Sequence, residues 1–248
     1  MKDIKKYREF LKSGPWNIWH ELETDQRKKI PEPPLQKPYP ENAKLIDLVP
    51  YEKITIKDRS LKEIIKKRRS RRKYSDRPIS MEELSFFLWA TQGLSGRDKH
   101  FRTAPSAGAR HPFETYLGIL NVDMLKPGIY RYLPLEHRLL FIYEDNNLSE
   151  KLVDACLGQA FVGNAALVFI WSVIPYRTEW RYSVLSHKVI AIDIGHVCEN
   201  LYLAGEAVDV GICGIGAYDQ GKIDKIIQVD GEDEFTIYLA SVGKYHLT

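Results

Sequence analysis

The sequence has 248 residues, of which 36 are Lys or Arg and 33 are Asp or Glu, and 44% are hydrophobic. This describes an ordinary globular protein of one large domain, or at most two, with a substantial core. Its most apolar stretch, residues 165–174, is too short to cross a bilayer, and residues 1–9 lack the apolar core of a secretory signal. The three cysteines have no Cys-x-x-Cys spacing, which excludes the usual zinc and disulfide patterns. We therefore expect a cytoplasmic protein without a membrane anchor.

Proline is dense between about residues 29 and 50, which favours extended chain over helix. We predict a Pro-rich arm over residues 1–56 and one folded domain over residues 57–248. The arm begins with a short helix over residues 4–11, and Trp16 and Trp19 indicate that it docks on the domain.

Helices and strands mix in the rest of the chain without strict βαβ repetition, which predicts an α+β fold. Two capping boxes open helices, Ser60 with Glu63 and Ser80 with Glu83, and Gly93 ends the second helix. Periodicity then predicts strands over residues 115–120, 129–132, 139–143, 168–173 and 235–242, and helices over residues 149–159, 183–208 and 219–227.

Residues 66–73 hold seven cations around Ser70. Such a run is typical of a nucleic-acid patch, because clustered cations displace counterions from a phosphate backbone. The rest of the chain, however, has 29 basic and 33 acidic residues, so the excess is confined to one segment that continues a helix. This favours one small phosphate over a polyanion, although a nucleic-acid-binding module stays an alternative.

Three Gly-containing segments are candidates for ligand contact. In residues 104–112, small residues between two prolines leave backbone N–H groups open, although a tight turn explains the pattern equally well. Residues 211–218 lack the context of a dinucleotide fingerprint, and we expect their glycines to let the backbone lie against a planar ring. Residues 241–244 place Lys244 after a glycine at the end of a strand, a weak signal by itself.

Patterns for other chemistries are missing from the sequence. His187, His196 and Cys198 share the long predicted helix, but no metal-binding pattern joins them, and we expect buried, hydrogen-bonded histidines there. The sequence contains neither a Gly-x-Ser-x-Gly elbow nor a Walker A loop, which leaves serine hydrolase and P-loop chemistry unsupported.

Eight segments between about Leu61 and Lys244 resemble, in content and order, the nitroreductase family of flavoproteins and especially its SagB-type dehydrogenase branch. They are residues 68–72 (RRSRR), 88–93 (LWATQG), 102–108 (RTAPSAG), 127–132 (PGIYRY), 158–159 (GQ), 193–201 (DIGHVCENL), 214–219 (GIGAYD) and 242–244 (VGK). No single segment decides the assignment, but their common order is hard to reach by chance.

This resemblance implies a dimer with a mostly antiparallel sheet flanked by helices and with FMN at the subunit interface. The phosphate and pyrimidine edge would be held by Arg68, Ser70, Arg72 and Lys244, with Arg69 as a further candidate. The loop of Pro105, Ser106, Ala107, Gly108 and Ala109 would come from the other subunit and cover the ring. Ile215, Gly216 and Ala217 would lie by flavin N5, and Gln159 would touch the ring from the side.

The sequence departs from the family pattern at two places. Azoline-oxidising members carry a Lys-Tyr pair after the buried strand, whereas this chain has Arg181 and Tyr182, which we name as catalytic candidates. Arg is a poor base, so the change disfavours azoline oxidation, although Tyr182 could still exchange a proton. Arg110 and His111 replace an apolar residue and a tyrosine, and if they face the pocket they would favour an anionic or polar substrate.

The sequence thus predicts an FMN-dependent oxidoreductase that transfers two electrons as a hydride through flavin N5 to or from a small molecule. NAD(P)H is the electron donor that the resemblance implies, and no metal or nucleic acid is expected to take part. A flavin-binding protein without turnover is the second alternative. The substrate, the electron acceptor and the role of the arm are not specified by the sequence.

Overall fold

The computed structural model describes residues 4–56, 59–96 and 98–246. Seven strands form one sheet in the order β1-β4-β3-β2-β5-β7-β6, and every neighbouring pair is antiparallel. The strands are β1 (Leu45–Asp47), β2 (Phe113–Ile119), β3 (Gly128–Leu133), β4 (Arg138–Glu144), β5 (Leu167–Val173), β6 (Val210–Ile215) and β7 (Phe235–Lys244). The prediction of an α+β fold with a mostly antiparallel sheet is confirmed.

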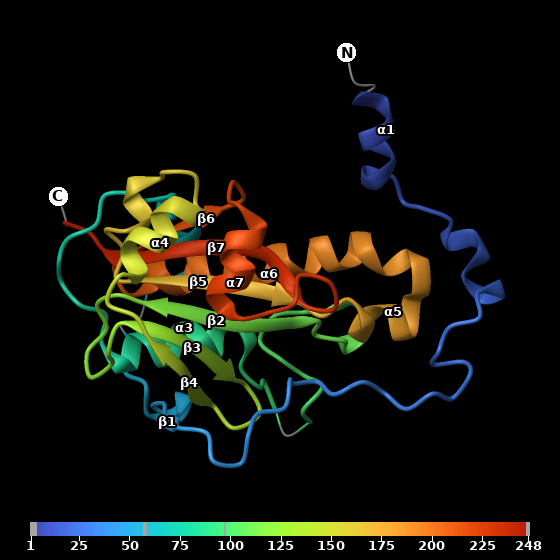
Figure 1. The fold of residues 1–248 in the computed structure, drawn as a ribbon, viewed down its shortest axis with the longest axis horizontal. Helices are drawn as coiled ribbons and strands as arrows, with labels where there is room; N and C mark the ends of the chain where they lie inside the picture. Colours follow the sequence, from blue (N-terminus) through green and yellow to red (C-terminus); the bar gives the residue numbers. More distant parts are fainter. Residues whose placement is uncertain (1–3, 57–58, 97, 247–248) are drawn as a thin grey trace.

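Helices cover both faces of this sheet (Figure 1). On one face, α3 (Met81–Gln92) and α6 (Ser186–Ala207) pack on a core that includes Phe169 and Trp171. On the other, α4 (Leu148–Ala155) and α7 (Gln220–Ile227) pack on a second core that includes Val168 and Ile170. Successive side chains of β5 therefore enter different cores, which explains why its sequence is apolar at nearly every position.

Capping side chains begin the helices where the sequence predicted. Ser80 and Glu83 form a complete capping box at α3, and Gly93 follows its last residue. Ser60 Oγ accepts from the backbone N–H of Glu63 at the start of α2 (Leu61–Lys67). The Asp219 side chain does the same for Lys222 at the start of α7. These contacts satisfy N–H groups that have no partner within the helix.

Two predicted helices have different bounds in the structure. The helix predicted over residues 149–159 ends at Ala155, because Leu157 and Gly158 adopt positive φ angles of 58° and 78°. The helix predicted over residues 183–208 begins only at Ser186. It is preceded by α5 (Tyr176–Tyr182) and η6 (Ser183–Leu185). The backbone changes direction between these two helices at Ser183, whose φ is 48°.

The segment over residues 211–218, whose glycines were expected to let the backbone lie against a planar ring, begins as strand β6. Its glycines are required by close packing inside the fold. A Cβ at Gly211 would lie 2.9 Å from Arg71 Cβ, and one at Gly214 would lie 2.4 Å from the Tyr238 hydroxyl. Only Gly216 and Ala217, beyond the strand, are exposed.

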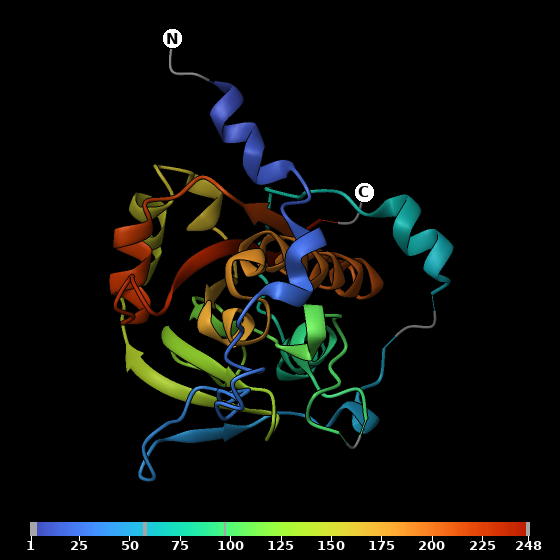
Figure 2. The ribbon, with the colours of Figure 1, turned by 90° about the vertical axis from the view of Figure 1, so that its right-hand side faces the viewer.

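Residues 4–56, the described part of the predicted N-terminal arm, add an edge strand to the sheet. The arm contains α1 (Ile4–Arg8), η1 (Glu9–Leu11), η2 (Trp16–Glu21), the edge strand β1 and η3 (Tyr51–Lys53). Figure 2 shows α1 standing away from the rest of the chain. Within the described residues, no helix is long and apolar enough to span a bilayer.

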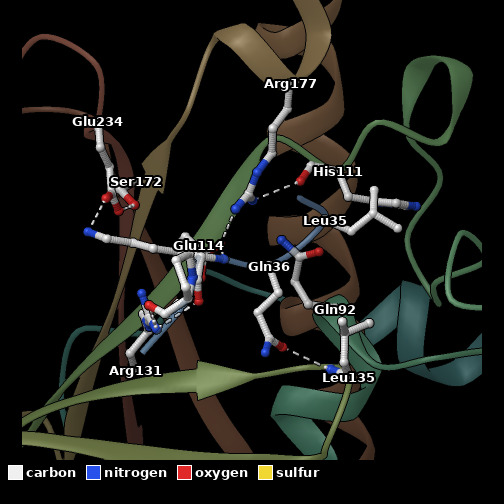
Figure 3. Close-up of polar contacts among 12 residues, drawn as sticks. Leu35, Gln36, Gln92, His111, Glu114, Arg131, Leu135, Ser172, Arg177 and Glu234 are labelled. Carbon is white, nitrogen blue, oxygen red and sulfur yellow. Dashed lines mark hydrogen bonds and ion pairs between the residues drawn. The ribbon is translucent and has the colours of Figure 1, made fainter. Parts of the chain in front are cut away.

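A buried cluster of charges fastens the middle of the arm to the sheet (Figure 3). Glu114 Oε1 on β2 accepts from the Lys37 backbone N–H at 2.7 Å and pairs with Arg177 Nη2 at 2.5 Å. Arg131 Nη2 donates to the Lys37 and Pro38 carbonyls at 3.0 Å each. The Lys37 ammonium pairs with Glu234 Oε2 at 2.5 Å. Extended Pro-rich chain is thus held by its own backbone groups, which a helix would have used internally.

Candidate functional site

Residues 68–72 leave α2 as extended chain and add to the open edge of the sheet at β6. Ser70 forms a parallel bridge with Ile212, and the Arg71 N–H donates to the Ile212 carbonyl at 3.0 Å. Because side chains alternate along extended chain, Arg68, Ser70 and Arg72 share one face. The basic run is therefore divided by geometry into two sets.

Tyr202, from α6, organises the first set. The Arg68 guanidinium lies 5.2 Å from the centre of the Tyr202 ring, and Ser70 Oγ lies 3.0 Å from the Tyr202 hydroxyl. That hydroxyl also accepts from the Gly214 N–H at 2.7 Å. Either hydroxyl can be the donor in the pair of Ser70 and Tyr202, and when Tyr202 donates, the Ser70 proton is available to another acceptor. An arginine beside a serine hydroxyl suits an anion such as a phosphate.

Arg72 continues this face toward the end of β6. Its guanidinium lies 5.6 Å from the centre of the Phe161 ring, and it opposes the effect of burial, which raises the pKa of the Cys213 thiol. Gln159 Nε2 donates to the Cys156 and Ala217 carbonyls at 2.8 Å each and so holds the chain after β6. A Cβ at Gly216 would meet no atom within 4 Å, so this backbone is open to a ligand, whereas Ile215 is buried.

The opposite face of the segment is structural. Arg71 Nη1 lies 2.6 Å from Oε2 of the buried Glu206, and its guanidinium lies 4.2 Å from the centre of the Tyr245 ring. Arg71 is therefore a structural residue, because the buried carboxylate of Glu206 needs a cation. Arg69 Nη1 donates to the Lys66 and Arg68 carbonyls at the end of α2, where helix carbonyls lack partners.

Lys244 lies away from the end of β6. It pairs with Val210, at the other end of the strand from Ile215, and its Nζ is 3.2 Å from Glu83 Oε1. The structure therefore brings Arg68, Ser70, Arg72, Gln159 and Gly216 toward one edge, while Lys244 is engaged at the start of α3.

The loop of residues 105–109 is held by Asp193 on α6. Asp193 Oδ2 accepts from Ser106 Oγ and from the Ala107 N–H at 2.8 Å each. Burial raises the pKa of Asp193, and these two hydrogen bonds oppose the rise. Gly108, at φ 60°, has no room for a side chain, because a Cβ would lie 2.6 Å from the Tyr182 hydroxyl and 2.7 Å from Arg181 Cδ.

The two catalytic candidates, Arg181 and Tyr182 at the end of α5, therefore lie next to the loop at Gly108. The Arg181 guanidinium is 5.5 Å from the centre of the Tyr182 ring, and Arg181 Nε is buried without a hydrogen-bond partner among the described residues. The rings of Trp16 and Trp19 lie 5.8 and 5.3 Å from the Tyr182 ring, so the predicted docking of the arm through these tryptophans is confirmed.

Arg110 and His111 are both buried among residues of the described chain, which does not fit the condition for an anionic substrate. Arg110 is buried and pairs with Glu32 of the arm, Nη1 to Oε1 at 2.6 Å, beside the Trp180 ring. His111 is also buried and donates from Nε2 to the His100 carbonyl at 2.8 Å. Burial, helped by the Arg102 guanidinium, lowers the pKa of His111 to about 3, so its ring is neutral.

Two groups of candidate residues are thus placed on different sides of α6. Asp193 and Tyr202 are nine residues apart, about 2.5 turns and about 13 Å along the helix axis, so they project in opposite directions. The Gly108 loop depends on Asp193, and the Arg68 face depends on Tyr202. The two groups of candidate residues, called half-sites below, are therefore apart within one chain.

Sequence reasoning missed Tyr202, Phe161 and Cys213 because no motif marks them, and only their contacts reveal them. It was also wrong about two histidines, since His187 and His196 are exposed rather than buried. His187 Nε2 lies 2.9 Å from Glu179 Oε1. Among the residues that the structure describes, no three His, Cys, Asp or Glu side chains are grouped as metal ligands.

Comparisons with known proteins agree with this fold and its motifs. The family profile described as "Nitroreductase family" matches residues 65–244. A nitroreductase-like relative from Methanocaldococcus jannaschii is 31% identical over 189 residues, which cover 76% of this chain and 93% of the relative. The trifolitoxin-processing protein TfxB of Rhizobium leguminosarum is 26% identical over 145 residues, 56% of this chain and 39% of that protein.

Solved structures show the same fold. A Ralstonia eutropha protein described as a nitroreductase has a TM-score of 0.68 at 24% identity and covers 88% of this chain and 100% of its own. One from Anabaena variabilis has a TM-score of 0.66 at 25% identity and covers 75% of this chain, which spans 38% of that longer chain. The microcin synthetase complex of E. coli contains a chain with a TM-score of 0.63 at 17% identity, covering 84% of this chain and 80% of that one.

Proposed function

Because this chain belongs to the nitroreductase family of oxidoreductases, we propose that it is an FMN-dependent, NAD(P)H-linked oxidoreductase acting as a homodimer. Its branch would be the SagB-type dehydrogenases, which the likenesses to TfxB and to the microcin synthetase complex support. When bound, FMN would supply two-electron hydride transfer through its N5 atom.

The observation that carries the proposal is the shared face of Arg68, Ser70 and Arg72. Two guanidinium groups and a serine hydroxyl fit a phosphate dianion. The exposed backbone of Gly216 and Ala217 lies farther along the same edge and fits a flat ring that needs close approach to main chain. Arg69 is less suited to this role, since it closes the end of α2. Lys244 ranks below the two arginines, because Glu83 offsets its charge.

The two half-sites explain why a dimer is proposed. Pro105, Ser106, Ala107, Gly108 and Ala109 would cover the ring bound to the other subunit, since Asp193 holds them on the far side of α6 from Tyr202. Arg181 and Tyr182 would reach that same ring beside Gly108. Tyr182 would hold or release a proton at its hydroxyl, and Arg181 would orient a substrate by its fixed positive charge.

The reaction partner would be a small molecule, with NAD(P)H as electron donor. A structural neighbour from Clostridium acetobutylicum is named an NADH oxidase, with a TM-score of 0.53 at 18% identity. Azoline oxidation is disfavoured, because Arg181 cannot act as the base that a lysine could provide.

One absorbance experiment on the purified full chain tests this function. We expect flavin bands that bleach when NADH or NADPH is added without oxygen and return when a quinone or nitroaromatic is added. A yellow protein that neither nucleotide bleaches would favour the second candidate, a flavin-binding protein without turnover. A colourless protein that does not take up added FMN would overturn both.

The nucleic-acid alternative is less well supported. Arg71 pairs with Glu206 and Arg68 lies on Tyr202, so these two cations are only partly exposed and have partners within the chain, while the other five remain exposed. DNA binding with a steep salt dependence in a protein that takes up no flavin would restore it.

A further inference from the structure

Residues 4–11 present an exposed apolar surface. Helix α1 and η1 bury none of their residues, and Ile4, Tyr7, Phe10 and Leu11 are 65%, 68%, 54% and 71% exposed. At helical spacing these four cover one side of the segment, and the basic residues Lys5, Lys6 and Arg8 of α1 point elsewhere. A stripe of this kind is typical of a helix that packs on another surface.

A cleft of about 1210 Å³ opens between α3, the second half of α6 and the end of the arm. Its apolar lining includes Ile64, Phe86, Trp89, Leu203 and Ala207. The volume exceeds the ~300–1,000 Å³ of usual small-molecule sites, so the cleft suits a polypeptide segment better.

Charge supports the same match. The charged side chains that line the cleft are the carboxylates of Asp47, Glu52 and Glu136, and no Lys or Arg is among its described lining residues. Residues 4–11 carry three basic residues, all in α1, and one acidic residue, Glu9, which pairs with Lys12. A basic helix with an apolar stripe therefore complements an apolar cleft with an acidic rim.

The chain's own α1 cannot reach the middle of its own cleft. Lys188, near the start of α6, donates to the Leu11 carbonyl and to the Lys12 carbonyl. Leu203 lies fifteen residues farther along α6, about 22 Å away, whereas Ile4 is only about 10 Å from Leu11 along a helix axis. If the cleft holds a segment with the sequence of α1, that segment therefore comes from a second copy.

We propose that residues 4–11 of each subunit dock into the α3–α6 cleft of the other subunit, as a reciprocal arm exchange in a twofold dimer. A twofold axis repeats the contact, so two arms fill two clefts. The arm exchange and the proposed function both require a homodimer, but the arm exchange does not require bound flavin.

Photo-crosslinking in the full-length protein tests the exchange. The photoreactive residue p-benzoylphenylalanine replaces Tyr7, and this protein is mixed with ¹⁵N-labelled wild-type chain under conditions that let subunits exchange. We expect cross-links from position 7 to labelled peptides that contain cleft residues such as Trp89 or Leu203. The same probe at Met124, which is 93% exposed, should give none of these products.

Reversing the basic charges of the arm provides the second readout. The double substitution K6E/R8E should lower the interchain cross-link yield about fivefold, given the modest strength of exposed charge pairs. Neither residue is buried in its own chain, so folding should be unchanged by circular dichroism. Cross-links within one chain only, cross-links to another surface, or a monomeric protein would each overturn the exchange. Flavin absorbance recorded on the same samples separates these results from failure of the proposed function.

Discussion

Arg68, Ser70 and Arg72 present hydrogen-bond donors to the same face, whereas Arg69 does not. Replacing an arginine by alanine should therefore affect FMN binding differently at different positions of this segment. R68A and R72A each remove a cation from the proposed phosphate site. We expect each to weaken FMN binding about 10- to 100-fold, since hydrogen bonds to charged groups are worth about 1.5–3 kcal/mol. Titration of apoprotein with FMN, followed by flavin fluorescence, measures the change.

R69A is the matched control for these two substitutions. Arg69 closes α2 through two backbone carbonyls, so its loss should leave the FMN affinity within about threefold of wild type. Unchanged affinity in R68A and R72A would show that the phosphate lies elsewhere.

His111 makes stability depend on pH. Its pKa is about 3 in the folded chain and near 6.5 when unfolded, because burial disfavours the charged ring. Between these values only the unfolded chain binds the proton, so the free energy of unfolding falls as pH drops from 6.5 toward 3. The slope from this residue is at most about 1.4 kcal/mol per pH unit. Urea midpoints at several pH values should show it in wild type and a shallower slope in H111N.

Other titratable groups also change the free energy of unfolding with pH, but they do so equally in wild type and in H111N. Burial also lowers the pKa of His137, which adds to the loss in both proteins, whereas the raised pKa of Asp193 opposes it in both. Equal slopes for wild type and H111N would mean that His111 is charged in the folded chain.

Among the elements, those with a local signal could be predicted from sequence. The Ser80–Glu83 capping box and Gly93 mark both ends of α3, and the unbroken apolar run of β5 reflects burial in two cores. Strand β6 could not be recognised, because its glycines resemble a loop and are required only by Arg71 and Tyr238, which are distant in sequence. Helix α5 was missed because no side chain caps its start, and the turn at Ser183 that ends it depends on one backbone angle.

The same distinction applies to the candidate site. Alternation alone groups Arg68, Ser70 and Arg72, so sequence reasoning could assign them together. The neighbours that determine what each cation does are far away in the chain: Tyr202 for Arg68, Glu206 for Arg71 and Glu83 for Lys244. Patterns of short range cannot report such contacts.

The arm and the sheet are joined through Glu114, which makes E114Q a test of that connection. A neutral amide would leave Arg177 and Arg131 buried without their carboxylate, at a cost of about 3–5 kcal/mol. We expect a lower urea midpoint and faster proteolysis within residues 22–40. D47N is the control, since Asp47 pairs with Arg138 in solvent and its loss should cost at most about 1 kcal/mol. Intact arm protection in E114Q would show that the backbone contacts suffice.

At the scale of the whole molecule, helix α6 separates the two groups of candidate site residues. One side holds the Gly108 loop through Asp193, and the other carries Tyr202 beneath Arg68 and Ser70. A rigid helix keeps the two half-sites of one chain apart, so under the proposed function a complete site would require two chains.

Flavin retention should therefore depend on protein concentration. If each ring is held by one subunit and covered by the Gly108 loop of the other, dilution that dissociates the dimer also removes half of each site, and FMN should be released. Flavin fluorescence, which rises on release, should increase over the same dilution range in which sedimentation shows monomer forming. G108A should shift both transitions to higher protein concentration, because its Cβ would collide with Tyr182 and Arg181. G195A, where a Cβ has open space, should leave both unchanged or slightly more stable. FMN that stays bound to monomers would place the whole site within one chain.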